Sequence, residues 1–182
     1  YHMHHFQLAG AEFVFARRHH ADGGRAFGHG EADGFDGAVE VFIDLEHLRF
    51  LGKGAKEVIF EKSGDEQPYF YINSAPAHHT YPNKKITKNE AEIVELGEEK
   101  YANKRTINKL IVNSVLETCQ LQMGMTELHP GSVWNTMPAH THARRMEAYF
   151  YFDLEEGQTV SHFMGQPHET RHIFMTNRQA VL

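Results

Sequence analysis

A regular alternation of short apolar runs and turns is the feature that most constrains the fold of this chain. After residue 107, runs rich in β-branched and aromatic residues recur, separated by turn signals such as HPGS, LEEG and GQPHE. The runs are INKLIVNSV, ETCQLQMGMTEL, RRMEAYFYFDL, QTVSHFMG and RHIFMTN. Short strands with a turn roughly every 8–12 residues are typical of sandwiches and barrels rather than of α/β folds. The spacing therefore predicts an all-β class.

The earlier part of the chain has the same texture between residues 38 and 75, in AVEVFIDL, HLRFLGKGAKEVIFE and QPYFYINSA. We predict a partial β region over residues 1–80, a linker over 81–106 and a C-terminal barrel over 107–182. The mixed charge of the linker indicates at most one short helix, around residues 89–96. Because RQAVL stops within an apolar run, we expect the C-terminal barrel to be truncated at its end.

Composition excludes several classes of partner. The chain has 182 residues, 41% of them hydrophobic, and a formal charge of −6 that argues against a nucleic-acid surface. No apolar run reaches the roughly 18–20 residues that cross a bilayer. The only cysteine, Cys119, excludes an internal disulfide and fits a reducing compartment. We therefore expect a cytoplasmic protein that binds neither nucleic acid nor a membrane.

Residues 138–152, PAHTHARRMEAYFYF, carry the strongest chemical signal. Side chains alternate along a strand, so His140 and His142 point to the same side. A bend after them would bring Glu147 into the same cavity, and Gly131 and Gly157 stand where a small barrel must turn corners. Two imidazoles and a carboxylate are good ligands for a divalent first-row metal. The spacing H-x-H-x4-E favours a metal site over a polar turn.

The same alternation divides the residues around Glu147 between two faces. Tyr149 and Tyr151 share its face, and Arg145 could aim a guanidinium at the mouth of the cavity. The opposite, packing face is predicted to hold Met146, Ala148, Phe150 and Phe152.

Three histidines follow this segment. We predict that His162, His168 and His172 lie at the surface or beside the ligands rather than on the metal.

The G…H-x-H-x4-E…G pattern within β sequence resembles the first motif of the cupin superfamily. Longer words resemble the 4-deoxy-L-threo-5-hexosulose-uronate ketol-isomerases, also called 5-keto-4-deoxyuronate isomerases. These words include LGKGAKEVIF, VLETCQLQMGMTEL, WNTMPAHTHARRMEAYFYFDL and HFMGQPHETRHIFM. The resemblance covers about residues 45–182, and its words match in order.

The resemblance implies a chain of two cupin barrels, both incomplete here, and a homohexamer. It also implies one Zn²⁺ per subunit, held by His140, His142 and Glu147. The fourth ligand of the family, a histidine, would follow Leu182, and residues 1–44 depart from the expected N-terminal cupin. The implied reaction is an aldose–ketose isomerisation in the breakdown of pectin-derived uronates.

We expect this reaction to move a proton between adjacent carbons through an enediolate, with Arg145 holding the substrate carboxylate. The proton carrier is unassigned, with Tyr149 and Tyr151 as candidates because they share the face of Glu147. Two alternatives stay open. One is an iron-dependent cupin dioxygenase, because the same ligands suit iron(II), and the other is a non-catalytic sugar-binding or regulatory cupin.

Overall fold

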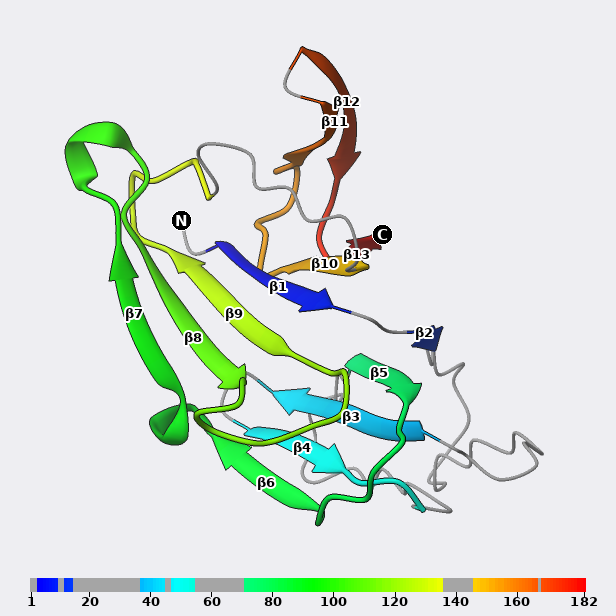
Figure 1. The fold of residues 1–182 in the computed structure, drawn as a ribbon. Coiled ribbons are helices and arrows are strands. Elements are labelled where there is room, and N and C mark those ends of the chain that lie inside the picture. The colour runs from blue at the N-terminus through cyan, green and yellow to red at the C-terminus, as the bar shows by residue number, and fades with distance from the viewer. Residues whose placement is uncertain are drawn as a thin grey trace, which may run out of the picture.

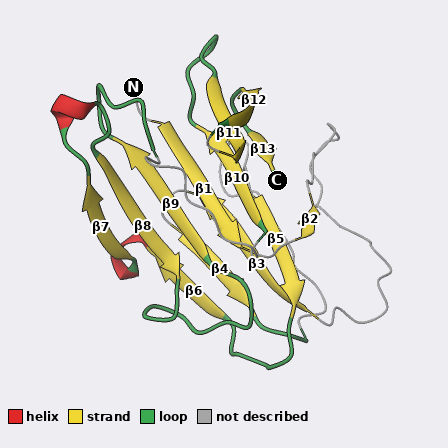
Figure 2. Ribbon diagram, turned by 45° about the horizontal axis from the view of Figure 1, so that its top comes forward, coloured by secondary structure: helices red, strands yellow, loops and turns green. Residues whose placement is uncertain are grey.

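The computed structural model describes residues 3–9, 12–14, 37–44, 47–54, 71–135, 146–166 and 168–182, with the backbone alone up to His47. The described residues form strands joined by turns, and their only helical segments are two short 3-10 turns (Figure 2). The strands are β1 (Met3–Ala9), β2 (Glu12–Val14), β3 (Gly37–Asp44), β4 (His47–Leu51), β5 (Tyr71–Pro76), β6 (Lys84–Thr87), β7 (Glu92–Leu96), β8 (Arg105–Ile111), β9 (Met123–Leu128), β10 (Glu147–Phe152), β11 (Val160–Gln166), β12 (Glu169–Met175) and β13 (Gln179–Val181). The predicted all-β class is confirmed.

These strands pair into three antiparallel sheets, whose arrangement Figure 1 shows. The first has six strands in the order β13-β10-β1-β9-β8-β7, and the second has five in the order β2-β5-β3-β4-β6. The hairpin of β11 and β12 forms the third. Both larger sheets keep open edges among the described strands, and those strands close no barrel. The two incomplete cupin barrels stay a prediction.

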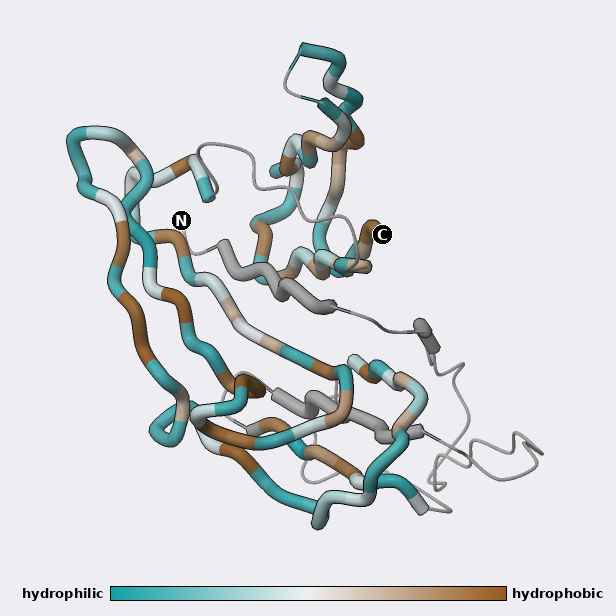
Figure 3. The backbone as a smooth tube through the Cα atoms, in the orientation of Figure 1, coloured by the Kyte–Doolittle hydropathy of each residue, from teal (hydrophilic) through white to brown (hydrophobic). Residues whose placement is uncertain are grey.

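A shared core joins the two larger sheets. The buried side chains Leu48, Tyr71 and Ile86 come from the five-stranded sheet and pack with Met125 and Phe152 of the six-stranded sheet in one cluster. Hydrophobic and hydrophilic segments alternate along the coloured strands of Figure 3, so strands such as β9 and β10 can offer an apolar face to this core. Burying these apolar side chains is the main force that holds the two sheets together.

Two glycines form turns at the positions where we expected a change of direction. Gly131 has a φ of 82° and Gly157 a φ of 80°, both in the left-handed region that favours glycine. Backbone hydrogen bonds close both turns, from Ser132 N–H to His129 O at 2.9 Å and from Gln158 N–H to Glu155 O at 3.0 Å. The first turn follows β9, and the second connects β10 to β11.

Residues 81–106 correct one expectation. They contain β6, β7 and the first two residues of β8, whereas we predicted at most one short helix there, around residues 89–96. That segment begins in a 3-10 turn (Lys88–Glu90) and continues as β7, which pairs along its length with β8. Pairing with a neighbouring strand outweighs the helix propensity of its glutamates. The division into regions 1–80, 81–106 and 107–182 stays a prediction.

Candidate metal centre

The two faces of β10 differ in chemistry, as the alternation of its residues predicts. Ala148, Phe150 and Phe152 pack into the core between the two larger sheets, and Phe150 stacks on Tyr71 with ring centroids 4.8 Å apart. Tyr149 and Tyr151 belong instead to a separate apolar cluster, built with Leu154, Met175 and Val181. The strand therefore separates a packing face from a face with polar tips, as predicted for Ala148, Phe150 and Phe152. The prediction is wrong for Met146, which precedes β10 and is 42% exposed.

Glu147 begins β10 and lies half-buried. The hydroxyl of Tyr149 donates a hydrogen bond to its Oε2 at 2.7 Å. Burial raises the pKa of Tyr149 well above its ordinary value, and the hydrogen bond to the Glu147 carboxylate raises it further. The phenol therefore keeps its proton at physiological pH and remains a donor to this carboxylate.

His162 completes this group of side chains from the neighbouring hairpin. Its Nδ1 lies 2.8 Å from the hydroxyl of Tyr151, and its ring meets that of Tyr149 edge-on with centroids 4.9 Å apart. Burial raises the pKa of Tyr151 and lowers the pKa of His162, so both groups are neutral near pH 7. Which of the two donates the proton depends on the histidine tautomer. We call Glu147, Tyr149, Tyr151 and His162 the β10 cluster.

The protonation states of the β10 cluster limit what its phenols can do. A proton carrier works best when its pKa lies near the working pH. The pKa values of Tyr149 and Tyr151 are moved in the opposite direction, away from neutrality. Both phenols are therefore suited to hold a carboxylate or an imidazole in place and poorly suited to carry a proton between two carbons.

The structure places part of the predicted site. Glu147 is described, whereas His140, His142 and Arg145 lie outside the described residues. Within those residues, His, Cys, Asp and Glu side chains nowhere gather in the group of three or more that a metal ion needs. The convergence of the three proposed ligands stays a prediction.

Glu147 is the proposed ligand that the structure describes, and its surroundings test whether the site suits a metal ion. The Glu147 carboxylate is half-buried and its position is set by a hydrogen bond, as metal-ligating carboxylates usually are. Carboxylate oxygen and imidazole nitrogen together form a donor set that binds zinc well. The residues present therefore suit a divalent cation.

The three later histidines differ in their surroundings. His162 lies beside the Glu147–Tyr149 pair, as the sequence allowed. His168 stands exposed in the turn between β11 and β12. His172 is exposed on β12, where its ring lies 5.3 Å from that of Phe174.

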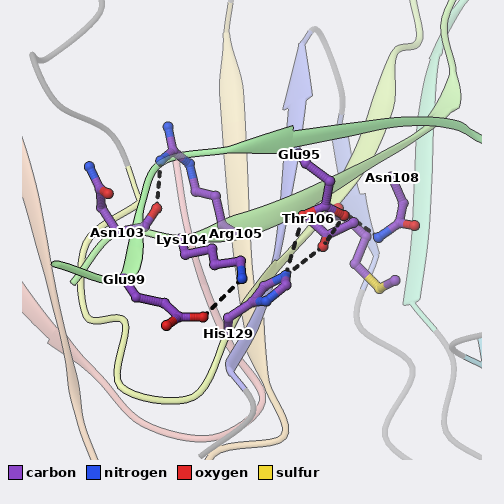
Figure 4. A network of polar contacts seen from close by, with 9 residues as sticks. Glu95, Glu99, Asn103, Lys104, Arg105, Thr106, Asn108 and His129 are labelled. Carbon is purple, nitrogen blue, oxygen red and sulfur yellow. Dashed lines mark hydrogen bonds and ion pairs between the residues drawn. The ribbon is translucent and has the colours of Figure 1, made fainter. Parts of the chain in front are cut away.

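A second group with similar chemistry lies at the far edge of the six-stranded sheet, where Glu95, Thr106 and His129 point toward one another (Figure 4). Thr106 donates its hydroxyl proton to Glu95 Oε1 at 2.7 Å, and the Thr106 hydroxyl oxygen lies 2.8 Å from His129 Nε2. Glu95 Oε2 is 3.5 Å from that same nitrogen. A nucleophile–base–carboxylate relay needs the two partners on different ring nitrogens. Both partners here lie near the same nitrogen, so this surface cluster is a network of polar contacts without a relay.

Sequence reasoning missed the surface cluster and left the role of His162 open. The register pairs Glu95 with Thr106 across β7 and β8, a contact that requires β7 to be recognised as a strand. His162 stands 11 residues from Tyr151 in the chain and reaches it through the hairpin. No local spacing rule predicts either contact.

The chain is all-β, has two facing sheets and carries a carboxylate after an H-x-H motif. These features are typical of cupin-like proteins with a metal centre. Comparisons then specify the family. The sequence profile described as KduI/IolB family matches residues 31–182, and this chain belongs to that family.

Curated relatives agree with this assignment. The chain is 60% identical over 141 residues to the 4-deoxy-L-threo-5-hexosulose-uronate ketol-isomerases of Yersinia pestis (strain Pestoides F) and Yersinia pseudotuberculosis serotype O:1b (strain IP 31758). Each alignment covers 77% of this chain and 51% of the relative. The chain thus spans about half the length of the curated relatives that it matches.

The structure also bears on the expectation about membranes. Among the described residues, helices of the length and apolar character that would span a membrane are absent.

Proposed function

We propose that this chain carries the metal centre of a ketol-isomerase that converts 5-dehydro-4-deoxy-D-glucuronate to 3-deoxy-D-glycero-2,5-hexodiulosonate in pectin and uronate breakdown. The observation that carries this proposal is the 60% identity over 141 residues to relatives named as ketol-isomerases. The family match over residues 31–182 supports it. Such a reaction is an intramolecular oxidoreduction, because one carbon of the substrate is oxidised while its neighbour is reduced.

In this proposal His140, His142 and Glu147 hold one Zn²⁺ per subunit. The bound ion supplies a Lewis acid that stabilises negative charge on substrate oxygens. Arg145 binds the uronate carboxylate, because a guanidinium offers paired donors that match the two carboxylate oxygens. The Glu147–Tyr149 hydrogen bond supports the assignment of Glu147, because it orients the carboxylate at the start of β10.

The proton that moves between the two carbons needs a separate carrier. The raised pKa values of Tyr149 and Tyr151 argue against both phenols in that role. We therefore assign Tyr149 to the support of Glu147 and leave the proton carrier to another group.

The family resemblance and the single cysteine, Cys119, extend the proposal to a cytoplasmic homohexamer that acts on a small-molecule uronate. Sedimentation velocity tests the assembly. A sixfold mass agrees with it, and a monomeric mass at micromolar concentration contradicts it.

The metal assignment is tested by zinc content and isomerase turnover in His140→Ala and Glu147→Gln. Both variants should lose bound zinc, and turnover should fall with it, because each removes one of three ligands. His172→Ala is the matched control, since this exposed histidine lies on β12 among aromatic rings. Unchanged zinc content in both ligand variants would overturn the assignment.

The same preparations separate the rival functions. Isomerase turnover without oxygen consumption agrees with the proposal. Oxygen consumption that requires added iron(II) would favour a dioxygenase. Uronate binding without turnover would favour a non-catalytic sugar-binding protein.

A further inference from the structure

The contact between Tyr149 and Glu147 is the most specific polar contact beside the candidate metal centre. The two residues stand two positions apart on β10, so their side chains project from the same face of the strand. The donor–acceptor distance of 2.7 Å lies in the range of a strong O–H···O⁻ bond. The contact thus joins a proposed ligand to a side chain that is not itself a ligand.

The ring of Tyr149 is held in place on its other sides. It packs in the apolar cluster that contains the buried side chains Tyr151, Leu154 and Met175. The His162 ring meets it edge-on at 62°, and Nδ1 of that histidine is itself engaged with the Tyr151 hydroxyl. A ring held in this way has little rotational freedom left, so its hydroxyl stays directed at the Glu147 carboxylate.

A carboxylate that is already oriented loses less conformational entropy when it binds a cation. Outer partners of this kind typically contribute about 10–100-fold to metal affinity. We propose that Tyr149 is a positioning residue that orients the Glu147 carboxylate toward a divalent cation, with His162 keeping the Tyr149 ring in place. This inference rests on the proposed function, because it takes Glu147 as a ligand.

The experiment compares Tyr149→Phe with Tyr151→Phe. Each variant removes one hydroxyl from the same face of the same strand and keeps its ring, but only Tyr149 donates to Glu147. Zn²⁺ affinity is measured by competition with a chromophoric chelator. We expect Tyr149→Phe to weaken binding by about tenfold or more and Tyr151→Phe by less than about threefold. The absorption spectrum of bound Co²⁺ should change in Tyr149→Phe alone.

A second background separates positioning from general structure. In Glu147→Asp the side chain is one methylene shorter, so its carboxylate lies farther from the Tyr149 hydroxyl. Adding Tyr149→Phe in this background should therefore change Zn²⁺ affinity by less than about twofold. An equal loss in both backgrounds would mean that the hydroxyl acts through overall structure, and it would overturn the inference. Denaturation in excess chelator checks that each variant is folded.

The outcomes also separate the two levels of the argument. If Glu147→Gln loses Zn²⁺ while Tyr149→Phe binds Zn²⁺ like the wild type, Tyr149 is not a positioning residue. The assignment of Glu147 as a ligand is then retained. Glu147→Gln that binds Zn²⁺ like the wild type overturns the proposed ligand, and the positioning role with it.

Discussion

The β10 cluster and the surface cluster contain the same three kinds of group, yet their surroundings differ. In the surface cluster one hydroxyl, that of Thr106, lies 2.7 Å from Glu95 and 2.8 Å from His129. In the β10 cluster two separate hydroxyls do this, because Tyr149 bonds Glu147 at 2.7 Å and Tyr151 lies 2.8 Å from His162. In the surface cluster the side chains of Glu95 and His129 remain 58% and 32% exposed. In the β10 cluster Tyr151 is buried, and Glu147, Tyr149 and His162 are half-buried, with His162 supplied by the β11–β12 hairpin.

This difference decides what each cluster can do. Water competes for every exposed donor and acceptor, and salt screens exposed charges, so surface pairs contribute little. Removing water makes each polar contact stronger and moves pKa values, as it does for Tyr149 and His162. Residue types therefore do not identify a functional site until their burial is known.

The largest expected effect comes from truncating the buried ring of the β10 cluster. Tyr151→Ala should lower the free energy of unfolding by about 3–5 kcal/mol, as expected for a buried aromatic side chain. Tyr151→Phe keeps the ring and removes the hydroxyl that lies beside His162, so it should cost about 1 kcal/mol. Urea denaturation at pH 8 measures both. Equal losses in the two variants would show that the hydroxyl, and not the ring, stabilises this face.

A smaller effect concerns pH. Burial lowers the folded-state pKa of His162, so protons bind it more readily in the unfolded chain. The contribution of His162 to the free energy of unfolding is therefore fully present above its pKa in the unfolded chain, about 6.5. This contribution falls as the pH drops toward the lower pKa of the folded chain. His162→Gln should lose less stability than the wild type between pH 8 and pH 5. Identical pH profiles by urea denaturation would contradict the burial of this imidazole.

The smallest effect belongs to the surface cluster. Thr106→Val removes the hydroxyl that bonds both Glu95 and His129 but keeps the branched shape that suits β8. We expect the free energy of unfolding to change by less than about 1 kcal/mol, because water replaces the lost partners. Zn²⁺ affinity should not change. A loss as large as that of Tyr151→Ala would place the two clusters in the same class.

Much of the fold could be predicted because its signals are local. Alternation along residues 146–152 assigned each aromatic side chain of β10 to its face, and the glycines at 131 and 157 marked turns. Both signals arise from the geometry of a few neighbouring residues, which other parts of the chain cannot change.

Other features depend on distant partners. The sequence EIVEL of β7 carries two glutamates that are common in helices, and only its pairing with β8 makes it a strand. The candidate site divides in the same way. Glu147 and its face follow from spacing, whereas the approach of His162 does not.

From sequence alone came the all-β class, the two faces of β10 and the choice of Glu147 as a ligand candidate, because the period of a strand depends only on its own backbone. Tertiary structure alone decided that His162 of the hairpin lies against the Tyr149 ring. It also decided that the surface cluster remains exposed to water. Burial is a property of the assembled sheets, and no short segment contains it.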